Sequence, residues 1–120
     1  MRNVASEPST TPLSVDCIFD ALADPWQRRL LTYLRDRGGS STVTEAAEAL
    51  AKANGERPSG SPAEEVEQIR TALYHVHVPK LEDQRLLSYD RERERIELTE
   101  YVCYLVPYLK QAAKDEQLLS

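Results

Sequence analysis

The stretch of residues 63–98, AEEVEQIRTALYHVHVPKLEDQRLLSYDRERERIEL, contains the change of hydrophobic period that decides the fold. Its first part has an apolar residue at every third or fourth position, which is typical of one helix face: Val66, Ile69, Leu73 and Val76. This pattern predicts the longest helix of the chain, from Ala63 to Val78. Pro79 lacks a backbone N–H, so we expect a kink or break near Val78 and one further turn after it.

In the second part of the stretch the apolar period changes to two. Apolar and polar residues alternate over 87–90 and again over 95–98, which predicts two short strands that face each other. The intervening Arg91-Glu92-Arg93-Glu94 must contain the turn, although it lacks the Asn-Gly or Asp-Gly pair typical of tight hairpins. In an extended chain Arg91, Arg93 and Arg95 would project to one side and give the hairpin a basic edge.

Three shorter helices are predicted before this stretch. The first follows the N-cap residue Ser14, and its apolar residues have helical spacing: Val15, Ile18, Phe19 and Leu22. The second starts at Asp24-Pro25, an N-cap followed by proline, and ends at Gly38-Gly39. The third is short and Ala-rich, and it runs from about Thr44 to Asn54-Gly55. Residues 54–62 (NGERPSGSP) are rich in Gly, Pro and Ser and are predicted to form a loop.

A last helix is predicted after the hairpin, with Thr99 as its N-cap and a bend at Pro107. Three helices, a longer helix, a two-stranded hairpin and a closing helix follow each other in the order of a winged helix-turn-helix domain, a mainly α fold of the α+β class. The hairpin would be the wing and the long helix the recognition helix. We therefore expect a disordered leader (1–13), a winged helix-turn-helix domain (14–98), and a C-terminal dimerisation helix with a tail (99–120).

Two segments of the chain resemble the ArsR-like winged helix-turn-helix regulators: Asp24-Pro25 with Leu30-Leu31, and the run from His77 to Leu87. IFDALADP (18–25), YHVHVPKL (74–81) and Tyr89-Asp90 are more closely similar to an uncharacterised family of haloarchaeal winged-helix domains of unknown function. The resemblance implies DNA binding without a known ligand. The chain departs from the ArsR-like pattern at Trp26-Gln27, at Arg85 and in the long loop 54–62, and it lacks the sensor cysteines of the metal-binding members.

Composition places the chain among small globular proteins. The 120 residues have the length of one domain; 41% of them are hydrophobic and 29% are charged. No apolar run approaches the roughly 20 residues of a membrane helix, and the first 13 residues lack the apolar core of a signal peptide. Only two cysteines occur, too few for a disulfide framework. We expect a soluble, cytoplasmic protein.

The charge balance restricts how the chain binds nucleic acid. The formal net charge is −5, which excludes a nonspecific basic coat, so affinity for DNA must come from a local patch. The basic residues are 11 Arg and 4 Lys, and an acidic, Arg-rich surface suits a protein kept in concentrated salt. High salt weakens phosphate contacts by counterion release, so such a protein needs more contacts with base edges or DNA shape.

The expected role is a sequence-specific regulator of transcription that binds double-stranded DNA. Glu64, Glu65 and Glu67 suit the positive end of the long helix but repel phosphate, so the contacts are expected further along it and in the hairpin. The candidates are Arg70, Thr71, Tyr74, His75 and Lys80 of the helix and Arg91, Arg93 and Arg95 of the hairpin. For the helix residues, the alternative is an ordinary solvent-exposed surface. For the hairpin residues, the alternative is a solvated hairpin whose charges pair across the strands. A winged helix that binds a protein partner instead of DNA is also open, and the acidic balance favours it.

We expect a homodimer, because the apolar stripe of the last helix is larger than is needed to cover the core of one small domain. The candidate interface consists of Val15, Ile18 and Leu22 of the first helix and Val102, Leu105, Val106 and Leu109 of the last. On this interpretation, Leu105→Glu or Leu109→Glu would give a soluble monomer. The alternative is that the closing helix folds back on its own domain.

The sequence contains no signature of an enzyme, a metal site or a cofactor site. There is no nucleophile elbow or phosphate-binding loop, so catalysis is not expected. His75 and His77 are two residues apart, so on a helix they diverge by about 200° and do not hold one ion together. His77 is expected at the edge of the core, bonded to a nearby carbonyl. Cys17 and Cys103 are expected to be buried hydrophobic residues, with redox sensing as the alternative.

Overall fold

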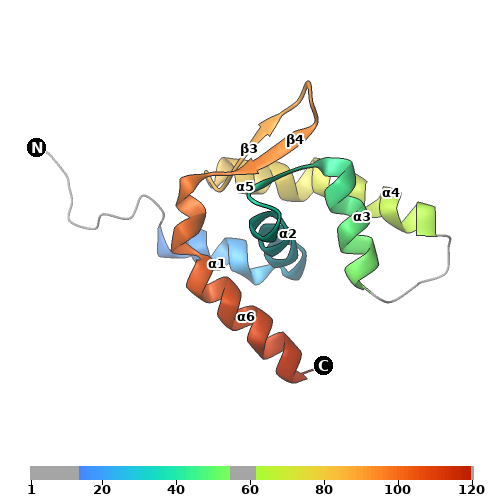
Figure 1. Cartoon of the computed structure of the whole chain (residues 1–120). Helices are drawn as coiled ribbons and strands as arrows, with labels where there is room; N and C mark the ends of the chain where they lie inside the picture. The colour runs from blue at the N-terminus through green and yellow to red at the C-terminus, as the bar shows by residue number, and fades with distance from the viewer. Residues whose placement is uncertain (1–13, 55–61, 120) are drawn as a thin grey trace, which may run out of the picture.

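A computed structural model describes residues 14–54 and 62–119 of the 120-residue chain. The leader predicted for residues 1–13 and residues 55–61 of the predicted loop lie outside the described residues. In chain order the elements are α1 (Val15–Ala23), α2 (Pro25–Asp36), β2 (Ser40–Thr42), α3 (Val43–Asn54), α4 (Pro62–Ala72), the π-helix η1 (Leu73–His77), α5 (Val78–Asp83), β3 (Leu87–Asp90), β4 (Arg95–Leu98), the 3-10 helix η2 (Glu100–Tyr104) and α6 (Val106–Leu119). Figure 1 shows α2 near the centre, with the hairpin projecting beyond the helices.

The predicted starts of α1 and α2 and the predicted end of α2 are confirmed. The Ser14 side chain accepts a hydrogen bond from the Cys17 backbone N–H at 3.0 Å, and the Asp24 carboxylate accepts one from the Trp26 N–H at 2.8 Å. After α2, Gly38 and Gly39 have φ angles of +85° and +107°, which side chains disfavour and glycine adopts freely. The Gly39 N–H donates to the Leu34 carbonyl, which closes the helix end.

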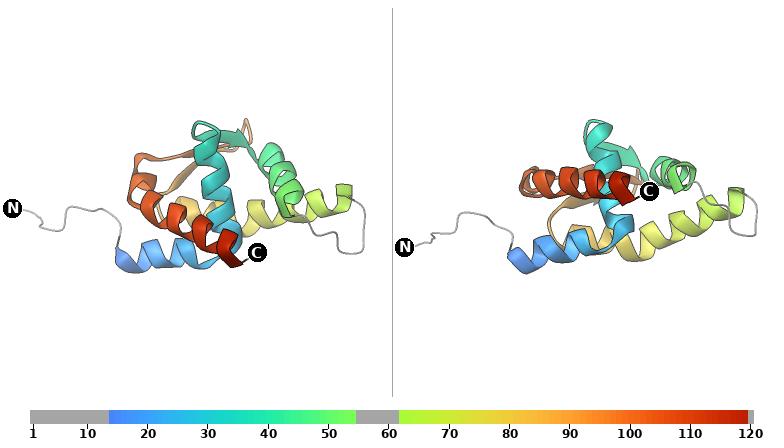
Figure 2. Two further views of the ribbon diagram at one scale, coloured as in Figure 1. Left: turned by 60° about the horizontal axis from the view of Figure 1, so that its bottom comes forward. Right: turned by 90° about the horizontal axis from the view of Figure 1, so that it is seen from below.

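A kink or break near Val78 and one further turn after it were predicted; the further turn is present as α5, but Pro79 does not break the helix. Helical structure continues from Pro62 to Asp83 through α4, η1 and α5. The Val78 N–H donates to the Leu73 carbonyl five residues earlier, which is the wide turn of a π-helix. A widened turn just before a proline takes up the missing N–H bond and the bulk of the ring. Figure 2 shows the three segments as one long rod.

The hairpin is one part of a three-stranded antiparallel sheet with the order β2-β4-β3. β3 and β4 form the two predicted strands, with Tyr89 opposite Ile96. β2 was not predicted, and it pairs with β4 so that Ser41 lies opposite Ile96. The alternation places Leu87 and Ile96 in the core and leaves Ser88 and Glu97 exposed. The α+β class is therefore confirmed, and the order of the elements is compatible with a winged helix.

The core lies between α2, α3, the long helix and the sheet. Its largest fully buried apolar residues come from these elements and from the segments next to them: Leu30, Leu31 and Leu34 of α2, Val43 of α3, Leu73, Val78 and Leu81 of the long helix, Leu86 before β3, Ile96 of β4 and Leu105 before α6. α3 contributes small residues, Ala46, Ala47 and Ala51, which allow α2 and α4 to approach it closely. The Ala-rich pattern of α3 thus serves helix packing.

The C-terminal segment corrects part of the predicted dimer interface. Thr99 caps η2 instead of one continuous helix, and α6 starts only at Val106. Leu105 and Leu109 are 0% and 2% exposed, because α6 folds back on its own domain and inserts them into the core. They are not available to a second subunit, so assigning them to the interface was wrong. Val102 and Val106 are half-buried.

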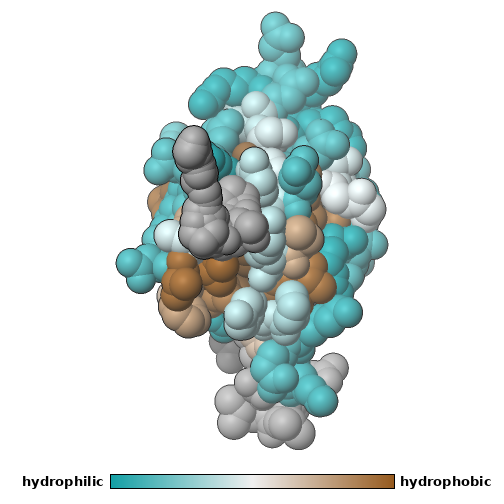
Figure 3. Space-filling view, turned by 90° about the vertical axis from the view of Figure 1, so that its left-hand side faces the viewer, coloured by the Kyte–Doolittle hydropathy of each residue, from teal (hydrophilic) through white to brown (hydrophobic). Residues whose placement is uncertain are grey.

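Apolar surface instead remains on α1. Val15 is 64% exposed and Phe19 is 61% exposed, whereas Ile18 and Leu22 are half-buried. Figure 3 shows apolar residues gathered on the side of the molecule where α1 and η2 lie. Two exposed tyrosines, Tyr104 and Tyr108, follow in η2 and α6.

None of the helices formed by the described residues is both long enough and apolar enough to cross a membrane.

Candidate nucleic-acid interface

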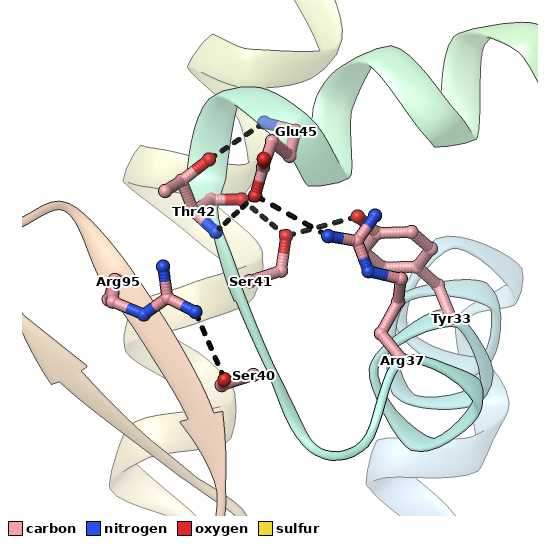
Figure 4. Close-up of polar contacts among 7 residues, drawn as sticks. All are labelled: Tyr33, Arg37, Ser40, Ser41, Thr42, Glu45 and Arg95. Carbon is pink, nitrogen blue, oxygen red and sulfur yellow. Dashed lines mark hydrogen bonds and ion pairs between the residues drawn. The ribbon is translucent and has the colours of Figure 1, made fainter.

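The junction between β2 and α3 is held by a reciprocal pair of hydrogen bonds (Figure 4). The Glu45 N–H donates to the Thr42 hydroxyl at 3.1 Å, and the Thr42 N–H donates to the Glu45 carboxylate at 3.3 Å. This is a capping box, and Thr42-Val43-Thr44-Glu45 has its T-x-x-E spacing. The helix was predicted to start near Thr44, so this local signal was missed.

Glu45 also determines the charge at this helix start. Its hydrogen bonds from Thr42, the backbone N–H first, and the nearby Arg37 guanidinium lower the pKa of the Glu45 carboxyl. Arg37 lies 3.7 Å from that carboxylate. A carboxylate therefore already occupies the positive end of α3, where a DNA phosphate would otherwise bind. The phosphate-binding groups must be sought on neighbouring elements.

Next to this junction, Arg70 of α4 connects its own helix with α3 and with the hairpin turn. From the last turn of α4 its Nε donates to the Thr44 hydroxyl of α3 at 3.2 Å. One terminal nitrogen is 3.4 Å from the Glu67 carboxylate of its own helix. The other is 3.8 Å from the Glu94 carboxylate in the hairpin turn. Arg70 thus ties the long helix to α3 and to the hairpin, and its side chain is still 29% exposed.

An aromatic cluster continues from Arg70 along the same side of the long helix. The Arg70 guanidinium lies 5.8 Å from the centre of the Tyr74 ring, and Tyr74 meets Tyr89 of β3 edge to face at 5.8 Å. The Arg91 guanidinium lies over the Tyr89 ring, 5.4 Å from its centre. Burial, and next to it Tyr74, raises the pKa of Tyr89 to about 12, so this ring carries no charge at neutral pH. The cluster joins the hairpin to the long helix.

Two of the predicted helix contacts are exposed beside this cluster. Thr71 and His75 are exposed, and the His75 ring stacks on Tyr74 with the ring centres 5.9 Å apart. The structure thus brings together four of the five predicted helix residues: Arg70, Thr71, Tyr74 and His75.

Lys80, the fifth, is not part of this group. Its ammonium nitrogen lies 3.5 Å from the Asp20 carboxylate of α1. Gln84 donates to the same carboxylate at 3.1 Å. Lys80 therefore joins α5 to α1, ten residues along the helix from Arg70, a distance of about 15 Å.

The three hairpin arginines do not lie on one side, which corrects the predicted basic edge. Residues 91–94 form a turn, with Glu94 at φ +52°, so the alternation of an extended chain does not continue through them. Asp90 holds this turn by accepting from the Glu92 and Arg93 N–H groups at 3.1 and 3.3 Å. Arg91 therefore packs on Tyr89, on the side of the long helix.

Arg93 and Arg95 lie on the outer face of the sheet. With Ser40, Ser88, Asp90 and Glu97 they line a polar hollow there. Arg95 donates to the Ser40 hydroxyl at 3.1 Å, and Arg93 lies 3.7 Å from Asp90 (Figure 4 shows the first contact). Arg93 keeps 79% of its side chain exposed. The hairpin thus has positive charge on two faces instead of one.

His77 lies at the core edge as predicted, but it is bonded to side chains instead of a carbonyl. The Gln27 amide is 3.4 Å from its Nδ1, and the Asp24 carboxylate is 3.9 Å from the same atom. His77 is 8% exposed, whereas His75 is on the exposed side of the helix. Burial lowers the pKa of His77, the Asp24 charge opposes this shift, and Lys80 adds to it.

This burial predicts that stability falls as the solution becomes acidic. The folded pKa of His77 lies below its usual value of 6.5, so below that pH the unfolded chain binds the proton first. As the pH is lowered from about 6.5 through the folded pKa of His77, we expect the free energy of unfolding to decrease. The His77→Gln substitution should remove the part of this decrease that His77 causes. Urea unfolding at pH 7.5 and pH 5 measures it. His75→Gln is the control and should behave like the wild type; equal pH dependence in all three proteins would contradict the assignment.

The two cysteines differ from the prediction that both are buried. Cys17 is half-buried, with its Sγ 3.9 Å from the Gln84 carbonyl, and Cys103 is exposed; both are free thiols. Burial raises the pKa of the Cys17 thiol, which makes it a poor nucleophile at neutral pH. Among residues 14–54 and 62–119, no group of three or more His, Cys, Asp or Glu side chains is placed to hold a metal ion.

Comparison with known proteins gives one family. No curated protein and no solved structure matches the chain significantly. A family profile matches residues 19–97, which extend from the middle of α1 to Glu97 in β4 and include the cluster around Arg70. Because this match covers more than half of the chain, the protein belongs to the family described as a domain of unknown function (DUF7344).

Proposed function

We propose that this protein is a transcriptional regulator that binds double-stranded DNA through the long helix and the hairpin. The observation that carries the proposal is the position of Arg70, which contacts α3, α4 and the hairpin turn at once. Around it, exposed Thr71 and His75 are available to base edges in the major groove. Arg91 and Arg93 are available to phosphates at either side of the hairpin. The ArsR-like resemblance and an order of elements that is compatible with a winged helix support this proposal.

On this proposal the protein is not an enzyme, and it binds its target DNA in the cytoplasm. Specific binding in an acidic protein depends on a few well-placed contacts, because the net charge of −5 repels the DNA as a whole. The cluster supplies such contacts. Arg70 and Arg91 are both stacked on tyrosines, which fixes the direction of their guanidinium groups before DNA arrives.

The experiment is selection of binding sites from a random duplex library. We expect wild-type protein to enrich one sequence, and Thr71→Ala or His75→Ala to lose discrimination at single positions, by roughly 1–3 kcal/mol for a good base contact. Nonspecific affinity should change little. Glu48→Ala, on the exposed side of α3, is the control. Unchanged site preference in both helix variants would remove the long helix from sequence reading.

We further propose a homodimer, with the interface on α1 in place of Leu105 and Leu109. Exposed Val15 and Phe19, next to half-buried Ile18 and Leu22, form the apolar surface for a second copy of the chain. A two-fold dimer would present two long helices to half-sites about one DNA turn apart. Light scattering should give a dimer for the wild type and a folded monomer for Phe19→Glu. A monomeric wild type at micromolar concentration would contradict the dimer.

One observation favours a protein partner as the second candidate function. Glu64 and Glu67 are exposed at the start of α4, and together with the acidic net charge they suit a basic protein surface better than phosphate. The library selection separates the two functions, because a protein-binding module enriches no DNA sequence.

A further inference from the structure

Three helices line a partly open cavity that takes no part in the candidate DNA interface. Its volume is about 250 Å³, and it lies between α2, α3 and α6. Figure 2 shows α6 crossing the side of the molecule formed by the other two helices. Among the described residues, none that lines the cavity belongs to the long helix or to the hairpin. A ligand there would leave the proposed DNA-binding side chains accessible.

Small side chains make up much of the cavity lining. Ala49 and Ala53 of α3 and Ala112 and Ala113 of α6 all line it, and buried Leu50 and Leu109 contribute to its wall. An apolar cavity of about 150 Å³ already holds a benzene molecule in another protein. The space between these helices therefore accommodates a single ring, or a hydrocarbon chain of similar size, with a small polar group attached.

The remaining wall, α2, is charged, and its two ends differ. Arg28 and Arg29 line one end, and Asp36 lines the other, about 10 Å along the helix axis from Arg29. Asp36 lies 3.8 Å from the Arg35 guanidinium, so its charge is partly compensated.

Arg29 contacts a ring instead of an acid. Its guanidinium lies 5.2 Å from the centre of the Trp26 ring, and within the described part of the chain it forms no ion pair with a carboxylate. The cavity thus has an apolar body, and two arginines, Arg28 and Arg29, line one end of it. This end is a local exception on a chain of net charge −5.

We propose that this cavity binds a small monocarboxylate with an aromatic ring or a short hydrocarbon body. The apolar body packs between Leu50, Leu109 and the lining alanines, where it is removed from water. The carboxylate lies toward Arg29, whose planar guanidinium donates two parallel hydrogen bonds to such a group. A cationic ligand is repelled at this end, and a neutral one leaves the guanidinium without an anionic partner.

This inference goes beyond the proposed function and does not depend on it, because binding to the free protein is measured without DNA. Trp26 is the only tryptophan of the chain, and Arg29 lies against it. A carboxylate that draws Arg29 away from the indole ring therefore changes the fluorescence of Trp26. We use benzoate as the probe and benzyl alcohol as its uncharged counterpart. Benzoate should give a saturable change, and benzyl alcohol should bind about tenfold more weakly.

Variants test the location, with amide chemical shifts as a readout that does not depend on Trp26. Ala49→Leu and Ala112→Leu fill the cavity from α3 and from α6, and each should weaken benzoate binding at least tenfold while the protein stays folded. Arg29→Gln should weaken it about tenfold and abolish the preference over benzyl alcohol. Arg85→Gln, the same change at an exposed arginine outside the cavity, should bind like the wild type. The proposal is overturned if benzoate does not saturate, if benzyl alcohol binds equally well, or if both leucine variants bind like the wild type.

Discussion

Leu105→Glu is expected to unfold the protein instead of releasing a folded monomer. Leu105 is fully buried between η2 and α6, in the same core as Leu30 and Ile96. Truncation of a buried leucine to alanine typically costs about 2–5 kcal/mol, and a buried unpaired carboxylate costs more. Small domains have only about 5–15 kcal/mol of stability in total. Loss of the helical circular dichroism signal at 25 °C measures the effect.

The control for this substitution is Lys110→Glu. Lys110 lies on α6, five residues from Leu105, and it is exposed. We expect its free energy of unfolding to stay within about 0.5 kcal/mol of the wild type. A folded, monomeric Leu105→Glu protein would show that the C-terminal segment belongs to an interface between subunits, and that its packing on its own domain is wrong.

Glu94→Gln is expected to strengthen DNA binding roughly five- to tenfold at about 0.1 M salt, and Arg70→Gln to weaken it by a similar factor. The Glu94 carboxylate lies 3.8 Å from Arg70, and both side chains are partly exposed. The ion pair competes with phosphate for the guanidinium, and the carboxylate itself repels phosphate. Removing the negative charge frees one cation for DNA, so the plot of log affinity against log salt should become steeper by about one.

Glu100→Gln is the matched control for charge. Glu100 is an exposed glutamate at the start of η2, outside the cluster around Arg70. Fluorescence anisotropy of a labelled duplex compares the three variants. If Glu94→Gln and Glu100→Gln change the affinity equally, the gain reflects net charge alone, and Arg70 has no special part in binding.

Local sequence signals were sufficient for most helix boundaries. Ser14, Asp24-Pro25 and Gly38-Gly39 act through their own side chains or backbone angles, so their effect does not depend on distant residues. The two hairpin strands were also predicted, because one face is buried and gives a period of two. The T-x-x-E capping box at Thr42 is an equally local signal that the prediction overlooked.

Features that depend on distant partners were not predictable in the same way. β2 has only three polar residues, and it is a strand because β4, more than fifty residues later, pairs with it. Leu105 and Leu109 formed an apolar stripe that fits a core and an interface equally well.

The candidate site shows the same division. Residue type and spacing selected Arg70, Tyr74 and Arg91, which the structure does bring together. The contact of Arg70 with Glu94 joins residues 24 positions apart in different elements, and no periodicity reveals it. The common side predicted for Arg91, Arg93 and Arg95 assumed an extended chain, whereas Asp90 folds these residues into a turn.

The most direct test of DNA binding is the salt dependence of affinity for the duplex selected from the random library. Anisotropy of that labelled duplex is measured from about 0.1 to about 1 M KCl, with a scrambled duplex of equal length beside it. We expect tighter binding to the selected duplex at every salt concentration, with log affinity falling linearly with log salt for both duplexes. Equal affinity for the two duplexes, or no binding to either at the lowest salt, would contradict a sequence-specific DNA-binding function.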